Sequence, residues 1–181
     1  MAVARHSYTY SDLVDMPDDG QRYEILDGEL VVSPSPSVRH QRTVGNIFLL
    51  LSRAEAANYG RVYLAPLDVV LDDHNVAQPD LFFITTARLS IVSEQHVPGA
   101  PDLVVEVLSP TTRSHDLGTK LGVYARYGVL WYWVVDPLVK TVQTYELREG
   151  TYRAAQLLEG DQMLSSPLFP GIMTEASTLF D

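Results

Sequence analysis

Glu106 is a carboxylate in a strand-like segment that otherwise contains apolar residues. It lies between Val105 and Val107 in DLVVEVLSP, and its neighbours on the same face of a strand, Val104 and Leu108, are apolar too. Burying an unpaired charge there is costly, so we expect Glu106 to be protonated, ion-paired or bound to a metal. A strand end that reaches solvent and a structural ion pair with an arginine are the alternatives.

Asp80 precedes a second apolar run, in QPDLFFI. Taken alone, it is typical of a turn or capping aspartate. Two acids on adjacent strands can instead converge on one cation, with a backbone carbonyl as a further oxygen ligand. Because the sequence has no cysteine, a metal site must use oxygen or imidazole ligands, which favours Mg²⁺ or Mn²⁺. Asp80 and Glu106 are therefore the predicted metal ligands.

Lys120 follows Glu106 in a segment whose pattern predicts a helix from about Ser114 to Tyr127. The predicted apolar stripe of this helix is Leu117, Leu121 and Tyr124, and rotation of 100° per residue puts Lys120 about 60° from Leu117. On this border of the buried face, the ammonium could lean toward acids at strand ends. The alternative is a lysine that packs its stem on apolar surface and extends its charge into water.

Other polar residues could complete such a site as outer ligands or phosphate contacts. Glu24 and Glu29 lie in a predicted hairpin, and His40 lies at the start of the first long helix. Asp116 precedes Lys120 at a helix start, where it most simply interacts favourably with the helix dipole. Glu24, Glu29 and His40 are each more commonly solvated surface residues. The candidate phosphate contacts are Arg39, Arg42 and Arg113.

The elements that must position these residues follow from local patterns. YEILDGELVV, residues 23–32, predicts a hairpin that turns at Asp27-Gly28. SPSPS ends it, with Ser35 as the predicted N-cap and Pro36 as the first residue of a helix. The helix carries an apolar stripe at helical spacing and ends before Gly60. The stripe consists of Val44, Ile47, Phe48, Leu51 and Ala54.

The rest of the chain alternates strands with one more helix. Strands are predicted over 61–71 and 76–85 around a polar turn at 72–75, over 102–110 and 131–137, and as an antiparallel pair over 140–147 and 151–158. From Gly160 the sequence predicts loop with a short terminal element. This order predicts an α+β or α/β fold, a mixed central β-sheet flanked by helices, in a single domain over residues 1–181.

Composition restricts the class of protein. The chain has 46% hydrophobic residues and 20% charged residues, and no apolar run near the ~18 residues that a membrane span needs, as in soluble globular proteins. MAVARHSYTYSDL has no apolar core of signal-peptide length, so we expect a cytoplasmic location. The net charge of -10 argues against a protein that coats nucleic acid through bulk charge. Local sorting of charge and a bound cation would both weaken that argument.

Several segments together resemble a known family. YEILDGELVVSPSPSVRHQR, PDLFFI and PDLVVEVLSPTTRSHDLGTKLGVYARYGVLWYWVVDP are similar to the bacterial family of small domains called "putative restriction endonucleases", within the PD-(D/E)XK nuclease superfamily. The resemblance implies a restriction-endonuclease-like core, a catalytic aspartate at Asp80 and a metal-binding glutamate at Glu106. Leu108 stands where the E-x-K motif has its lysine, and the family pattern supplies Lys120 on the following helix instead.

The resemblance implies a metal-dependent endonuclease that hydrolyses phosphodiester bonds in nucleic acid, with DNA as the expected substrate. Asp80 and Glu106 would hold Mg²⁺ or Mn²⁺, and Lys120 would orient or help deprotonate the attacking water, or stabilise transition-state charge. Small size and the paired sites that duplex cleavage uses favour a homodimer. A phosphodiesterase for RNA or small nucleotides would use the same site. A non-catalytic or regulatory module that retains the fold is the other alternative, against which the complete set of three residues argues.

Overall fold

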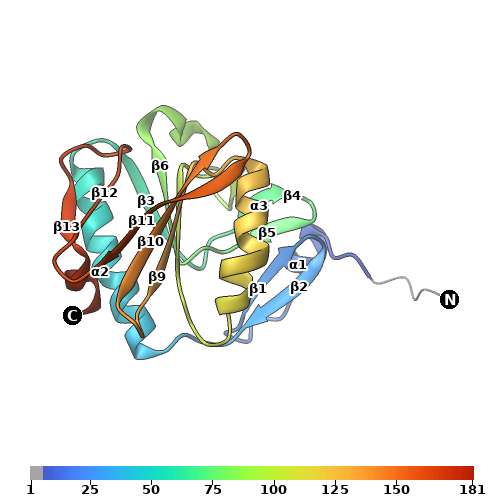
Figure 1. Ribbon diagram of the computed structural model, residues 1–181. Coiled ribbons are helices and arrows are strands. Elements are labelled where there is room, and N and C mark those ends of the chain that lie inside the picture. Colours follow the sequence, from blue (N-terminus) through green and yellow to red (C-terminus); the bar gives the residue numbers. More distant parts are fainter. Residues whose placement is uncertain (1–5) are drawn as a thin grey trace.

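The computed structural model describes residues 6–181. The first five residues of MAVARHSYTYSDL, in which no signal peptide is expected, lie outside the described residues. Runs of strands are separated by a few helices along the chain (Figure 1). The elements are α1 (Tyr10–Val14), β1 (Arg22–Leu26), β2 (Glu29–Ser33), α2 (Val38–Ala56), β3 (Gly60–Leu64), β4 (Val69–Asp72), β5 (Asn75–Ala77), β6 (Leu81–Thr85), η1 (Thr86–Ile91), β7 (Val97–Pro98), β8 (Leu103–Val107), η2 (His115–Thr119), α3 (Lys120–Tyr127), β9 (Trp131–Asp136), β10 (Thr141–Arg148), β11 (Thr151–Glu159), β12 (Met163–Ser165), β13 (Met173–Glu175) and η3 (Ala176–Phe180).

A six-stranded sheet in the order β11-β10-β9-β8-β6-β3 forms the centre of the structure. It is mixed, because β8 and β9 are parallel while the other neighbours are antiparallel. A second sheet has the order β2-β1-β5-β4-β7, and β12 pairs with β13 near the C-terminus. The predicted mixed central sheet flanked by helices is confirmed.

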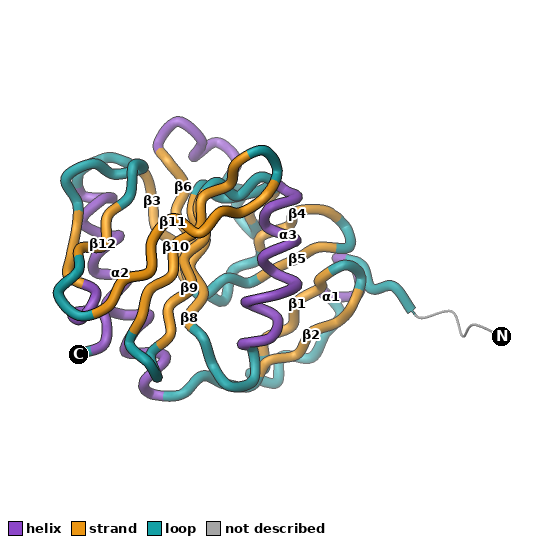
Figure 2. Tube along the Cα trace, in the orientation of Figure 1, coloured by secondary structure: helices purple, strands orange, loops and turns teal. Residues whose placement is uncertain are grey.

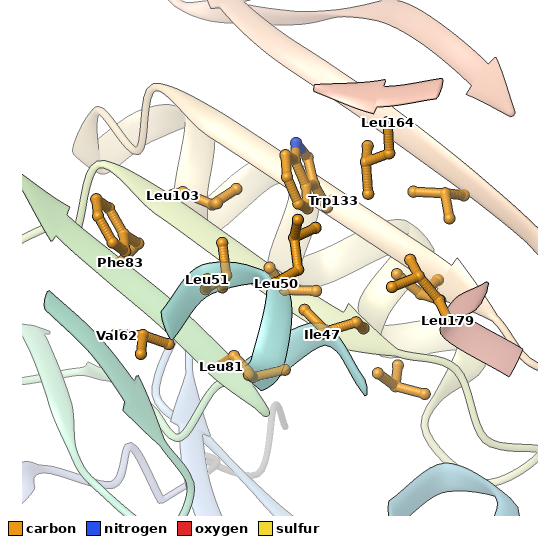
Figure 3. Close-up of a cluster of buried hydrophobic side chains, with 14 of the residues drawn as sticks. Ile47, Leu50, Leu51, Val62, Leu81, Phe83, Leu103, Trp133, Leu164 and Leu179 are labelled. Carbon is orange, nitrogen blue, oxygen red and sulfur yellow. The ribbon is translucent and has the colours of Figure 1, made fainter. Parts of the chain in front are cut away.

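Two hydrophobic clusters lie on opposite faces of the six-stranded sheet, because side chains alternate along a strand. On one face, Trp133 and Phe83 pack against Ile47 and Leu51 of α2, as Figure 3 shows. On the other face, apolar side chains of β6, β8 and β9 pack with residues of α3 and of the second sheet. Figure 2 shows α3 and the strands of the second sheet on the side of the six-stranded sheet that is opposite to α2. Glu106, whose strand neighbours Val105 and Val107 belong to the first cluster, therefore points to the α3 side.

The β1–β2 hairpin forms as predicted, and α2 begins later than predicted. Asp27 and Gly28 adopt φ values of 52° and 74°, the left-handed geometry of a tight hairpin turn. The N-cap of α2 is Ser37, whose Oγ accepts a hydrogen bond from the backbone N–H of His40. The predicted cap at Ser35 was wrong, because Ser37 is the residue whose hydroxyl reaches an unpaired N–H of the first turn.

Each of the two long strands predicted over 61–71 and 76–85 is divided in two. β3 and β6 join the six-stranded sheet, whereas β4 and β5 join the second sheet. Pro66 and Pro79 lie in the two breaks, and a proline has no N–H to donate to a β-ladder. The predicted turn at 72–75 is confirmed by the pairing of β4 with β5.

The C-terminal half agrees with the predicted order, with two differences. β8, β9 and the β10–β11 pair lie where strands were predicted, whereas the predicted helix over 114–127 begins with the π-helical turn η2 before α3. Gly128, at φ 84°, ends α3 as predicted. The tail contains β12, β13 and η3, more structure than predicted. Among residues 6–181, no helix combines the length and apolarity needed to cross a membrane.

Candidate active site

Asp80 lies just before β6 and is held by three donors. Its Oδ1 accepts from Arg22 Nη1 at 2.8 Å, and its Oδ2 accepts from the backbone N–H of Val107 at 2.8 Å and lies 3.1 Å from His40 Nε2. β6 pairs antiparallel with β8 through Leu81 and Val105, so the next residue in this register places Asp80 opposite Glu106. The side chains of such a cross-strand pair share one face of the sheet.

The donors around Asp80 keep it ionised. Burial by itself raises the pKa of Asp80, which is only 5% exposed, but the hydrogen bond from His40 and the charge of Arg22 act in the opposite direction and hold the pKa at about 2. Asp80 is therefore a fixed anion at the edge of the site.

Glu106 has one oxygen engaged and one free of hydrogen bonds. Oε1 accepts from Lys120 Nζ at 2.9 Å and from the Tyr124 hydroxyl at 2.9 Å. Oε2 is buried, without a hydrogen-bond partner among residues 6–181. Burial raises the pKa of Glu106 to about 8, although the Lys120 ammonium acts against this shift. Glu106 is thus the carboxylate with spare binding capacity.

Lys120 is surrounded by three carboxylates. Its Nζ lies 2.9 Å from Glu106 Oε1, 3.0 Å from Glu24 Oε1 and 3.5 Å from Asp116 Oδ1. Burial would lower the pKa of Lys120, but the charges of Glu106 and Glu24 outweigh burial and raise it. Glu24 is fixed in turn by the backbone N–H of Gln78, 2.9 Å away. The lysine therefore remains a charged ammonium.

The predicted helix face is confirmed at Tyr124 and Leu121, which belong to or pack against the core, and was wrong at Leu117. Lys120 is 1% exposed, rather than on the border of the buried face, and Leu117 of the predicted apolar stripe is 40% exposed. Asp116 is also buried rather than exposed at the helix start, and it forms an ion pair with Lys120. Burial raises the pKa of Asp116, although the charge of Lys120 acts to lower it. The π-helical turn η2 accounts for the difference, because the change from wider to ordinary helical geometry shifts the phase of the side chains.

Arg22 belongs to the cluster and was not predicted. It extends from β1, donates to the Gln78 carbonyl at 3.1 Å and to Asp80, and lies 3.8 Å from Glu24. The signal available in the sequence was weak: Arg22 and Glu24 are two charged residues on one face of a strand whose other residues are apolar or aromatic.

The structure does not bring every predicted residue to the cluster. His40 and Glu24 contact it, as described above. Arg113 instead donates to Asp136, with Nη1 2.5 Å from Oδ2. Glu29 is exposed at the start of β2. Arg39 is exposed on α2, and Arg42, also exposed, donates to the carbonyl of Asp181.

A cavity of about 810 Å³ opens beside the cluster. Asp80, Arg22 and His40 line it, whereas Glu106 and Lys120 are not among its lining residues. Most of the other lining residues come from the loop after α1, the segment before α2, the end of β3 with the residues after it, and residues 109–112. Access from the cavity therefore reaches the side of the cluster at which Asp80 lies.

Comparison with known proteins identifies the family to which the chain belongs. The family model "Uma2: Putative restriction endonuclease" matches residues 10–177, nearly the whole chain. The chain belongs to the Uma2 family. No curated protein matches the sequence. The resemblance inferred from the sequence motifs is thereby confirmed.

A solved structure has the same fold as this Uma2 chain. It is described as "a putative nuclease belonging to DUF820 from Anabaena variabilis ATCC 29413" and superposes with a TM-score of 0.79, covering 95% of this chain and 97% of that chain. The two sequences are 18% identical, so the similarity shows the fold alone. The family description supports a nuclease.

Restriction-endonuclease-like nucleases typically use divalent metals, and the chemistry of this Uma2 cluster fits such an ion. Among residues 6–181, no three His, Asp or Glu side chains form a group that could by itself hold a metal. Mg²⁺ commonly needs only one or two protein carboxylates, with water and substrate oxygens completing its shell. The cluster has four carboxyl groups and two permanent cations, so two negative charges are left unbalanced when all four acids are ionised, and the Glu106 Oε2, which has no hydrogen-bond partner among residues 6–181, is an available hard ligand. The four carboxylates are Glu24, Asp80, Glu106 and Asp116, and the cations are Arg22 and Lys120.

Proposed function

We propose that this Uma2 chain is a metal-dependent endonuclease that hydrolyses phosphodiester bonds in nucleic acid, with DNA as its substrate. One observation carries the proposal: Asp80 accepts a hydrogen bond from the backbone N–H of Val107, the residue next to Glu106, and Lys120 contacts Glu106. Two convergent carboxylates beside a fixed positive charge are suited to holding a cation next to a phosphate.

In this proposal Asp80 and Glu106 hold Mg²⁺ or Mn²⁺. When bound, the ion supplies a water of lowered pKa and screens the phosphate oxygens. Asp80 is preorganised for binding, because Val107, Arg22 and His40 fix both of its oxygens. Glu106 contributes Oε2 while Oε1 stays on Lys120.

The raised pKa of Lys120 favours an electrostatic role over that of a general base. A charged ammonium has no lone pair with which to take a proton from water. Lys120 instead orients Glu106 and places positive charge behind the site, where it stabilises the negative charge of the transition state. Arg22, which lines the cavity, is the cation positioned to contact a substrate phosphate.

Cleavage assays on single-stranded and duplex DNA and RNA, with Mg²⁺, Mn²⁺ or EDTA, test the proposal. We expect metal-dependent cleavage of DNA, and a loss of roughly 10²- to 10⁴-fold in Glu106→Gln, which removes one ligand charge while keeping the shape of the side chain. Glu94→Gln is the matched control, because Glu94 is exposed in the loop before β7. Parent-like cleavage by Glu106→Gln, or activity that persists in EDTA, would refute the assignment.

A further inference from the structure

The cavity beside Asp80 also restricts the form of the substrate. Resting on the proposed function, we infer that the site accepts an unpaired nucleotide, so that the substrate is single-stranded or locally unpaired nucleic acid rather than a continuous duplex. The inference depends on the volume of the cavity, its apolar walls and its small number of cations.

The volume of the cavity suits a nucleotide. About 810 Å³ is within the range of roughly 300–1,000 Å³ found for small-molecule sites. A double helix cannot enter a site of this size, whereas an extruded nucleotide can, as in enzymes that take a base out of the stack. Asp80 and His40, which line the cavity, are both at most 5% exposed, so a substrate must enter it to reach them.

Apolar side chains line the cavity beside the charged residues. Leu64, at the end of β3, lines it and is 38% exposed, and the backbone N–H of the next residue, Ala65, donates to the Asp80 carbonyl at 3.2 Å. Leu13, Met16 and other apolar residues line it as well. A sugar-phosphate backbone needs no apolar wall, but an unstacked base gains by packing on one. The wall at Leu64 is therefore suited to a base, with its phosphate toward Arg22 and Asp80.

The charge of the cavity wall is unlike that of a duplex-binding groove. Among the described residues that line it, Arg22 is the one with a permanent positive charge, and Asp18 and Asp68 add to the negative charge of Asp80. Arg39 is exposed in the first turn of α2, next to His40. Duplex-binding proteins that contact 6–10 phosphates show a steep salt dependence. One or two contacts to a single strand predict a slope of log K against log salt of only about -1.

Cleavage of a designed DNA provides the first test. The substrate is a 40-base-pair duplex with a central bubble of six unpaired nucleotides, compared with the fully paired duplex of the same flanking sequence, in Mg²⁺ or Mn²⁺. We expect the cuts to fall in the bubble and the paired duplex to be cleaved at least 10-fold more slowly. Equal rates, with cuts spread over paired sequence, would overturn this inference and leave the nuclease proposal standing.

Binding provides the second test, and it does not need turnover. Glu106→Gln protein is titrated into a labelled 12-nucleotide single strand and into its duplex, and anisotropy is measured at several salt concentrations. We expect tighter binding of the single strand, a slope near -1, and a loss of roughly 5-fold or more when Leu64→Ser is added. Leu49→Ser is the matched control, because Leu49 is 64% exposed on α2 and does not line the cavity.

The outcomes separate the two proposals. Preference for the single strand without cleavage of any substrate would refute the nuclease and support this inference. Tighter binding of duplex with a steep salt slope, or equal effects of the two leucine substitutions in variants that melt like the parent, would overturn the inference.

Discussion

Replacing Lys120 by Met should destabilise the protein strongly. The ammonium lies within 3.5 Å of Glu106, Glu24 and Asp116, and Lys120 is 1% exposed. Met keeps most of the apolar stem but leaves three buried carboxylates without their shared cation. Breaking a buried ion pair on one side costs about 3–5 kcal/mol. This is a large part of the 5–15 kcal/mol by which proteins are typically stable, so we expect a marginally folded variant.

Urea unfolding in EDTA measures this loss. With a slope of about 2 kcal/mol per molar urea, a loss of 3–5 kcal/mol lowers the midpoint by about 1.5–2.5 M. The loss should shrink as the pH falls, because carboxyl groups whose pKa values are raised in the folded variant take up protons and lose their charge. Adding Glu106→Gln removes one of the stranded charges and should recover part of the stability, with a coupling of about 0.5–3 kcal/mol.

Lys140→Met is the control, because Lys140 is exposed and is the only other lysine of the chain. It should leave the urea midpoint near that of the parent. A parent-like midpoint for Lys120→Met, or a loss of the same size at pH 5 and pH 8, would refute the argument that the ammonium neutralises the cluster.

Four further predictions concern the metal, acid, the core and assembly. Mg²⁺ or Mn²⁺ should raise the melting temperature of the parent more than that of Asp80→Asn or Glu106→Gln, and equal rises would place the metal elsewhere. The folded protein lowers the pKa of Asp80 from 3.8 to about 2, so the ionised Asp80 stabilises the fold above pH 3.8, and this stabilisation is lost as the pH falls through about 2. In urea unfolding without metal, the free energy of unfolding of the parent should fall over this range by about 2 kcal/mol more than that of Asp80→Asn. Thr144→Val should be neutral or stabilising by about 1 kcal/mol in urea unfolding, since the buried Thr144 hydroxyl has no hydrogen-bond partner among residues 6–181, and a clear loss would show that the hydroxyl is bonded. Sedimentation at micromolar concentration should show the homodimer that the small size of the chain favours, and monomer alone, with and without substrate, would contradict this.

The two acids of the candidate site could be predicted because each stands in a local context that does not favour it. Glu106 interrupts an apolar strand that is buried on both faces, and Asp80 precedes another. Their convergence could not be derived from local pattern. It depends on β6 pairing antiparallel with β8, across the intervening η1 and β7, in the register that puts Leu81 opposite Val105. A shift of one residue would direct one acid to the other face of the sheet.

Arg22 and Glu24 show a second limit of local patterns. The hairpin over residues 23–32 was predicted from the β-prone runs on either side of Asp27 and Gly28, because these signals are local. The association of β1 with β5 in the second sheet brings Glu24 to Lys120 on α3. Nothing within residues 22–33 specifies that contact, so a buried Glu24 could not be distinguished from a solvated strand acid.

Lys120 shows how charge pairing can override helical periodicity. The prediction assigned Leu117 to the buried face, because apolar burial usually decides which face of a helix is covered. Here the turn η2 changes the phase before α3 begins, so Asp116 and Lys120 are buried while Leu117 is 40% exposed. The exchange gives up apolar burial and encloses two charged groups, which is tolerable because each lies next to a charge of opposite sign. The departure from local preference therefore occurs where the proposed chemistry requires a positive charge, in agreement with the general tendency of functional sites to break such preferences.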